Sequence, residues 1–306
     1  MQSLWMLVAS FLFSIMGVCV KLASVDYSTA EIVAYRGAIG MLMIAMLVRF
    51  QGGTLRTGMP RHHLVRGGVG VISLWLWFYA LGKLPLAMAV TLNYMSPIWI
   101  AAILLTSAWW RKQRGLTWQP IAAILMGFVG VVLLLRPSIH TDQVMGGVLA
   151  LISGMLAAWA YMQVRQMGLL GEPEYRVVFY FSLTCAVAGL MGTLIGKSVY
   201  AAAGEVTWHH LDSRGIMLLL AIGVTAASAQ MAMTRAYRLG NTLVTANLQY
   251  VGIVFSSVWD VLIWKVSLAW LSWMGIVVIL CSGLIATFYN AKTNRKSIPG
   301  DAISSE

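Results

Sequence analysis

Two apolar stretches of the sequence each carry three polar side chains at matching positions. These side chains are Thr91, Asn93 and Tyr94 in the first stretch and Asn247, Gln249 and Tyr250 in the second. Hydroxyl, amide and phenol groups bind through hydrogen bonds, so their chemistry is recognition of a polar solute. Their repetition indicates an internal duplication with a polar site where the two copies meet.

The spacing places these groups together on helix surfaces. Thr91 and Tyr94 are three residues apart, as are Asn247 and Tyr250, so each pair shares a helix face. Asn93 and Gln249 each lie on the flank of the helix next to the face that the corresponding pair shares. In one interpretation all six residues line a cavity and bind substrate. In the other they join neighbouring helices by hydrogen bonds, and the repetition at matched depth favours the cavity.

Aromatic residues are the next candidates. Trp75, Trp77 and Tyr79 recur at alternate positions of one apolar run, as do Trp159 and Tyr161 in another. They predict an aromatic wall that accepts planar or cationic substrates. The alternative is packing against other helices or lipid.

Few polar or charged groups lie elsewhere in apolar sequence. Gln230 is a further candidate for the cavity, and Arg36 is the one basic residue well inside a run. Arg36 either ties its helix to a neighbour or binds a substrate carboxylate. Glu31 and Asp260 lie near the ends of runs, where they serve either proton coupling or the rim of the bundle.

Enzymatic chemistry finds no support in the sequence. No phosphate-binding loop, metal-ligand spacing or catalytic triad is present, and we expect no metal or cofactor. Cys19, Cys185 and Cys281 lie in separate apolar runs and predict small buried side chains. The net charge of +11 is spread over short clusters between these runs, so nucleic acid is not expected as a partner.

The composition identifies the surrounding medium as lipid. Hydrophobic residues make up 59% of the 306 residues and charged residues only 10%, against roughly 25% charged in soluble domains. Each apolar run is near the ~20 residues that cross a bilayer as helix. We predict ten spans, at about 4–22, 30–48, 67–82, 86–107, 118–135, 145–164, 177–196, 215–234, 242–264 and 269–288.

Basic residues predict the orientation of these spans. They are concentrated in the loops on one side, which places both termini in the cytoplasm. An odd number of spans per copy makes the copies inverted, as five-helix repeats at 1–138 and 139–289, with a disordered cytoplasmic tail at 290–306. Tyr94 and Tyr250 then lie roughly 12 Å from opposite faces, at ~1.5 Å per residue, and both approach the midplane.

The chain resembles the EamA type of the drug/metabolite transporter superfamily. The resemblance lies in the run 28–36, in 79–81, in 92–98 and in Gly127-x-x-Gly130 with its echo at Gly283. It implies a ten-helix carrier whose inverted repeats enclose a central cavity. The second half departs from the first, because Ile253 replaces the proline that matches Pro97 and Tyr180 replaces the arginine that matches Arg36.

The predicted function is therefore secondary transport, not catalysis. We expect a carrier in a bacterial-type inner membrane that moves a small organic metabolite, an amino acid or related compound, by alternating access, outward. The alternatives are a passive facilitator, an uptake or exchange carrier for a nucleoside- or vitamin-like metabolite, and, more remotely, a membrane enzyme. Coupling to protons and the oligomeric state stay open.

Overall fold

All regular structure in the described part of the chain is helical. The computed structural model describes the backbone of residues 2–83, 86–110, 118–135, 144–200, 209–265 and 267–296, and their side chains except those of 78, 79, 81–89, 195–200 and 290–296. The elements are the 3₁₀ turn η1 (Gln2–Leu4) and the helices α1 (Trp5–Ala23), α2 (Thr29–Phe50), α3 (Pro60–Lys83), α4 (Leu86–Asn93), α5 (Ser96–Trp110), α6 (Trp118–Leu135), α7 (Val144–Leu169), α8 (Glu174–Tyr200), α9 (Ser213–Leu239), α10 (Thr242–Leu248), α11 (Val251–Trp264) and α12 (Trp270–Lys296).

Nine segments of the described chain are long and apolar enough to cross a membrane. They match nine of the ten predicted spans, so the protein is a multi-pass membrane protein. The remaining prediction, 67–82, falls in α3, a helix of 24 residues whose side chains at 78, 79 and 81–83 lie outside the described residues.

Two predicted continuous helices are each divided in the structure. The run 86–107 becomes α4 and α5, and the run 242–264 becomes α10 and α11. Pro97 explains the first division, because a proline in the first turn of a helix has no N–H to donate to the preceding turn. The second division is a tightened turn, in which Gly252 N donates to the Gln249 carbonyl oxygen at 2.9 Å.

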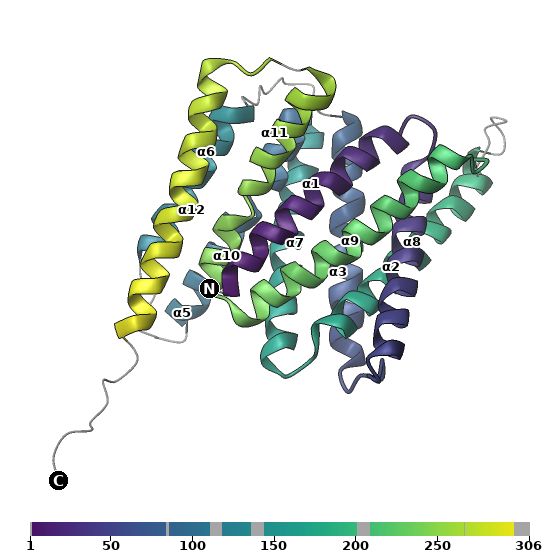
Figure 1. Ribbon diagram of the computed structural model, residues 1–306, viewed down its shortest axis with the longest axis horizontal. Coiled ribbons are helices and arrows are strands. Elements are labelled where there is room, and N and C mark those ends of the chain that lie inside the picture. Colours follow the sequence, from purple (N-terminus) through teal and green to yellow (C-terminus); the bar gives the residue numbers. More distant parts are fainter. Residues whose placement is uncertain are drawn as a thin grey trace, which may run out of the picture.

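Four helix pairs make the largest contacts of the bundle: α2 with α8, α6 with α12, α1 with α9, and α3 with α7. Each pair joins a helix from the first half of the chain to one from the second, and Figure 1 shows α6 beside α12 at one end of the molecule. Glycine permits the closest approaches. A Cβ at Gly130 would lie 2.9 Å from the Gly275 carbonyl oxygen, and one at Gly275 would lie 2.6 Å from that of Gly130.

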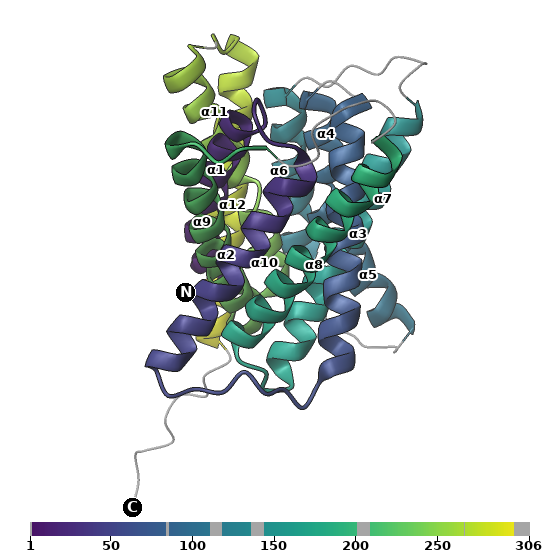
Figure 2. The same cartoon turned by 90° about the vertical axis from the view of Figure 1, so that its right-hand side faces the viewer.

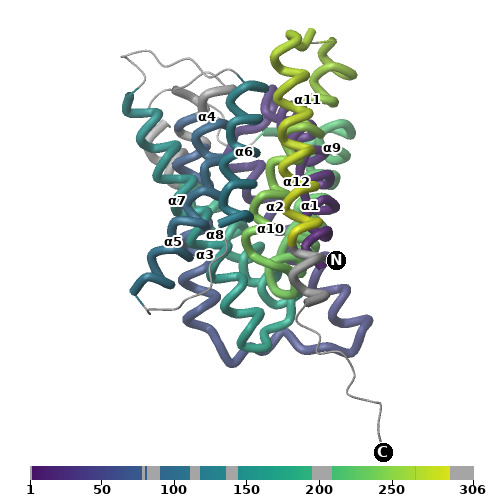
Figure 3. Tube along the Cα trace, turned by 90° about the vertical axis from the view of Figure 1, so that its left-hand side faces the viewer, coloured from purple at the N-terminus to yellow at the C-terminus, as the bar shows by residue number. Residues whose placement is uncertain are grey.

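The connections alternate between the two ends of the bundle (Figures 2 and 3). The N-terminus, the α2–α3 connection and the α7–α8 connection lie toward one end, and the α1–α2 and α11–α12 connections lie at the other.

Ion pairs tie the two halves of the chain at both ends. At the end with the N-terminus, His63 Nε2 lies 2.9 Å from Glu172 Oε1. At the other end Lys21 Nζ lies 3.2 Å from Asp260 Oδ1, and His209 Nδ1 lies 3.0 Å from Glu31 Oε2.

The acidic residue Glu31 is fully buried at the start of α2. It forms a capping box with Ser28 and accepts a hydrogen bond from the backbone N–H of His209 at 2.6 Å. Its position agrees with the interpretation of Glu31 as a rim residue at a helix N-terminus.

Candidate functional site

The two divided helices interrupt their hydrogen bonds at matching points. The first break falls at Tyr94 and Met95, and the second at Gln249 and Tyr250. In each break a backbone N–H donates three residues back, from Met95 to the Leu92 carbonyl at 3.3 Å and from Tyr250 to that of Asn247 at 3.2 Å. Broken helices leave backbone and side-chain polar groups available in the interior, and transporters use such breaks for binding.

The two breaks meet inside the bundle. Tyr94 packs against the buried cluster that contains Tyr250, Val251 and Ile253. The Tyr94 hydroxyl lies 3.5 Å from the position that a Cβ of Gly252 would take. The structure therefore brings together the two stretches that the sequence pattern matched.

Helix α6 closes against the second break through Gly127. A Cβ at this position would lie 2.7 Å from Tyr250 Cδ2 and 2.8 Å from both Asn247 Oδ1 and Ser282 Oγ. An added side chain would therefore force these neighbouring side chains to shift, so glycine at position 127 lets α6 reach the polar groups of the break.

The polar groups of the first break tie three helices together. Asn93 Nδ2 donates to Ser153 Oγ of α7 at 2.9 Å, and Ser153 and Ser73 of α3 exchange hydrogen bonds with each other's carbonyl oxygens at 2.8 Å. In this conformation Asn93 thus joins neighbouring helices. Thr91 is buried beside it on α4.

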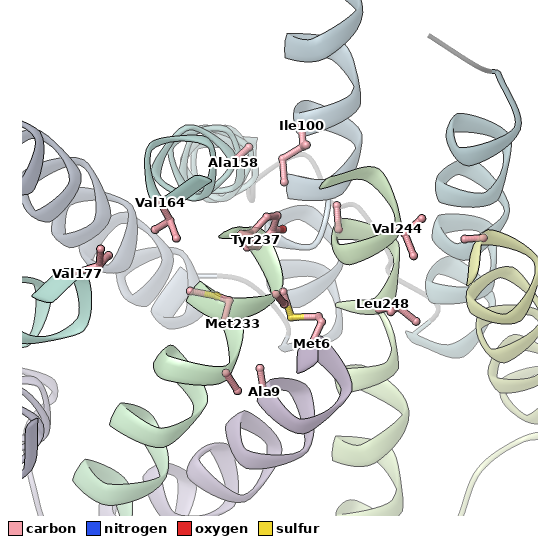
Figure 4. Packing of buried hydrophobic residues seen from close by; sticks show 14 of the residues in the cluster. Met6, Ala9, Ile100, Ala158, Val164, Val177, Met233, Tyr237, Val244 and Leu248 are labelled. Carbon is pink, nitrogen blue, oxygen red and sulfur yellow. The ribbon is translucent and has the colours of Figure 1, made fainter. Parts of the chain in front are cut away.

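The second break is bonded to an aromatic stack. Gln249 Nε2 donates to the Tyr237 hydroxyl at 2.8 Å, and the Tyr237 ring stacks on Tyr161 with centroids 5.5 Å apart. Figure 4 shows Tyr237 at the centre of a buried cluster to which α1, α5, α7, α9 and α10 contribute.

Two buried polar atoms of the second break have no hydrogen-bond partner among the described residues. They are Nδ2 of Asn247 and the hydroxyl of Tyr250, whose residues are 1% and 0% exposed. Asn247 Oδ1 accepts only a long bond of 3.4 Å from Ser282 Oγ. Buried polar atoms without partners are costly, so these two atoms are free to bond a group that enters the break.

Arg36 and Gln230 lie apart from the breaks, around a cavity between α2, α8 and α9. Ser182 and Cys185 of α8 complete its polar lining. The cavity measures about 10 Å³, which is room for roughly one water molecule. In this conformation the bundle is therefore closed at this position.

Two tryptophans of the predicted aromatic wall lie at the surface of the bundle. Trp75 is 43% exposed and lines an apolar groove between α3, α7 and α8, while Trp159 is 48% exposed on α7. The Tyr79 side chain lies outside the described residues. Tyr161, which was also part of the predicted wall, lies in the interior, where its ring stacks on that of Tyr237.

Three residues of the interior escaped the sequence-based site prediction: Arg66, Tyr237 and Ser153. Arg66 is grouped by sequence with the basic residues of a loop, yet its side chain is buried. Tyr237 lies between two arginines at a helix end, and Ser153 in a small-residue stretch. The glycines that follow Arg66 in the sequence could have indicated its burial, because they leave room for the arginine side chain to lie along its own helix.

Comparison with known proteins gives the family. Residues 1–136 match the EamA-like transporter family. The pseudopaline exporter CntI of Pseudomonas aeruginosa is 34% identical over 258 residues, which cover 84% of this chain and 85% of that protein. The chain belongs to the EamA-type drug/metabolite transporters.

More distant similarity extends over nearly the whole EamA-type chain. The riboflavin transporter of Vibrio cholerae is 24% identical, with 96% of this chain and 95% of that protein aligned. A protein of known crystal structure shares the fold with a TM-score of 0.79 at 20% identity, over 95% of this chain and 98% of that one. The protein is thus a transporter of small molecules and not an enzyme.

Proposed function

We propose that this EamA-type protein is a secondary carrier that moves a small organic metabolite by alternating access. The observation that carries the proposal is the meeting of the two broken helices, with Tyr94 packed against the cluster around Tyr250. The substrate would bind between the breaks, where Asn247 and Tyr250 hold polar atoms without partners. Movement of one half of the chain against the other would then expose this site to either face.

An inverted repeat of two five-helix units would account for the helix pairing. The first unit comprises α1, α2, α3, α4 with α5, and α6, and the second comprises α7, α8, α9, α10 with α11, and α12. Exchanging the units maps the α2–α8 and α6–α12 pairs onto themselves and the α1–α9 pair onto the α3–α7 pair. This exchange supports two-fold symmetry and ten spans.

The ion pairs between the halves fit the role of gates. Lys21 and Asp260 join the halves at one end of the bundle, and His63 and Glu172 join them at the other. Alternating access requires these two connections to open in turn, because a carrier never exposes its site to both faces at once.

For the substrate we propose an amino acid or a related compound, moved outward from the cytoplasm across the inner membrane. The relative with the exporter name supports this direction. The alternative is uptake or exchange of a vitamin-like metabolite, and the stacked rings of Tyr161 and Tyr237 favour it, because such a stack accepts planar ligands.

A reversible cross-link would test alternating access. Cysteines at Lys21 and Asp260, in a protein whose three native cysteines are replaced by alanine, should be joined by a short bifunctional thiol reagent with a reducible spacer, which holds one end closed. Transport of radiolabelled amino acids into reconstituted vesicles should stop on cross-linking and resume on reduction, while each single-cysteine variant stays active. Transport that continues through the cross-linked protein would refute alternating access.

The orientation needs its own test. A reporter that is active only in the periplasm should be silent when fused after Gln51, in the α2–α3 connection, and active when fused after Lys265, in the α11–α12 connection. The opposite result would place both termini outside the cytoplasm and refute the predicted orientation.

A further inference from the structure

Two arginines from different helices converge on one aromatic ring in the interior. The guanidinium carbon of Arg66, on α3, lies 4.1 Å from the ring centroid of Phe181 on α8. That of Arg36, on α2, lies 5.8 Å from the same centroid. Cation–π attraction holds both cations against the ring without neutralising either charge.

Half of the guanidinium nitrogens of these two arginines are buried without a hydrogen-bond partner among the described residues. Arg66 is only 3% exposed, yet its Nε and Nη1 have no hydrogen-bond partner among the described residues. The Nε of Arg36 likewise has none there. Arg36 Nη1 reaches the Cys185 sulfur at 4.0 Å, and a thiol is a weak acceptor.

No acidic side chain of the described chain balances these two charges. Five acids are engaged elsewhere: Glu31 with His209, Glu172 with His63 and Arg176, Glu174 with Arg238, Asp260 with Lys21, and Asp212 with the N-terminus of α9. The sixth, Asp26, is exposed in the α1–α2 connection. Buried cations without a counterion are expensive, and Arg36 and Arg66 are also close enough to interact electrostatically.

The surrounding helices are built to hold the guanidinium groups in place. A Cβ at Gly70 would collide with Arg66 Nη1, so the absence of a side chain lets Arg66 lie along its own helix. Ser182 and Gln230 line the adjoining cavity with Arg36. Both can donate to or accept from a group that enters between them.

We propose that Arg36 and Arg66 form a carboxylate-binding site and that the substrate is an organic acid anion or a zwitterion with an additional carboxylate. This inference rests on the carrier function proposed above. The planar guanidinium fork matches a carboxylate through two parallel hydrogen bonds. The carboxylate supplies both the missing acceptors and the missing negative charge.

Binding requires the cavity beside Arg36 to widen, since its 10 Å³ holds no more than a water molecule. The wall that must move is the contact of α2 with α8. A Cβ at Gly37 would lie 2.6 Å from the Ser182 carbonyl oxygen, so the two backbones are in direct contact there. Separation of α2 from α8 therefore couples carboxylate entry to movement between the two halves of the carrier.

Ligand-induced stabilisation of the purified full-length protein would test the site directly. The probes are linear dicarboxylates of increasing length, from succinate upward, each paired with its neutral diamide. The dicarboxylates should raise the unfolding temperature of the wild type, and the diamides should not. R36Q and R66Q should each weaken the apparent affinity for the best dicarboxylate by about 10- to 100-fold, because each removes a charge-assisted interaction.

Two further variants separate binding from a structural role. R49K alters an exposed arginine of α2 and should bind like the wild type. R66K keeps the charge but loses the fork, so it should retain stability and bind with intermediate affinity. Equal stabilisation by dicarboxylates and diamides, stabilisation by neither, or an unchanged affinity of both R36Q and R66Q would overturn the proposal.

Vesicle transport distinguishes failure of this inference from failure of the carrier function. If an uncharged metabolite is transported equally by the wild type, R36Q and R66Q, the carrier stands and the carboxylate site is refuted. If dicarboxylates stabilise the wild type but no metabolite is transported, the anion site stands and the carrier proposal is refuted.

Discussion

The hydroxyl of Tyr250 offers a sharp test of how this interior is built. Tyr250 is fully buried, and its hydroxyl has no hydrogen-bond partner among the described residues. Tyr237 is equally buried, but its hydroxyl accepts from Gln249 Nε2 at 2.8 Å. The same substitution, tyrosine to phenylalanine, should therefore have opposite effects at the two positions.

The magnitudes follow from hydrogen-bond energetics. A buried polar atom without a partner costs about 1–3 kcal/mol, so Tyr250→Phe should raise the free energy of unfolding by up to that amount. Tyr237→Phe removes an existing bond and leaves the Gln249 amide unpaired, which should lower the free energy of unfolding by about 1–3 kcal/mol. The two variants should then differ by about 1–6 kcal/mol.

Unfolding and transport assays on the same preparations measure both consequences. Tyr250→Phe should keep or gain stability in detergent, and its apparent affinity for substrate should fall about 2- to 10-fold if the hydroxyl binds substrate. Equal destabilisation by both substitutions would show that the Tyr250 hydroxyl has a partner and would refute the reasoning. A stable Tyr250→Phe carrier with unchanged transport would leave Tyr250 only a packing role.

Two other substitutions probe the packing and the ends of the bundle. Gly127→Ala should lower the free energy of unfolding by about 1–3 kcal/mol, because its Cβ would collide with the second helix break, whereas Gly68→Ala, with open space around it, should be neutral or stabilising in thermal unfolding. Burial alone would raise the pKa of Glu172, but hydrogen bonds from Thr57 and His63 outweigh it and hold this pKa below its ordinary value. The ionised carboxylate therefore stabilises the fold above the ordinary pKa, and this contribution is lost as the pH falls through the lowered one. Glu172→Gln should accordingly show less acid destabilisation than the wild type when the unfolding temperature is followed against pH.

The sequence was sufficient to predict the membrane setting and the location of the polar stretches. Lipid offers no hydrogen bonds to the backbone, so a long apolar run must pair its backbone groups within a helix. The helices could therefore be predicted from composition and length. The depth argument for Tyr94 and Tyr250 required only the rise of a helix and the alternation of spans. These two residues lie at the breaks that meet in the interior, and their depth in the bilayer stays a prediction.

Side-chain direction was beyond this reasoning, because it depends on which helices become neighbours. Trp75 and Tyr161 looked equivalent as aromatic residues in apolar runs. Packing of α3 against α8 leaves Trp75 in an outer groove, whereas packing of α7 against α9 stacks Tyr161 on Tyr237. The rotation of a helix about its own axis determines whether an aromatic side chain faces the interior, and a short aromatic pattern does not predict this rotation.

The burial of Arg66 illustrates a different limit. Position next to a basic loop predicts a solvated arginine, and the positive-inside rule counts it as a topological signal. Its guanidinium instead extends along α3 over Gly70 to the ring of Phe181. A long side chain can place its charge a full helical turn from its Cα, so residue depth alone does not locate the charge.

Some of the buried polar atoms that have no partner among the described residues lie where the proposed carrier would need them. Asn247 and Tyr250 at the second break, and Arg36 and Arg66 beside Phe181, together leave amide, phenol and guanidinium groups unsatisfied in the closed conformation. Each such atom lowers the stability of the empty carrier by about 1–3 kcal/mol, and more for a charged group. A ligand that satisfies them recovers this free energy on binding, and only in a conformation that admits it. The same groups therefore favour binding and link it to opening of the bundle, because no described residue forms a hydrogen bond with these atoms in the closed conformation.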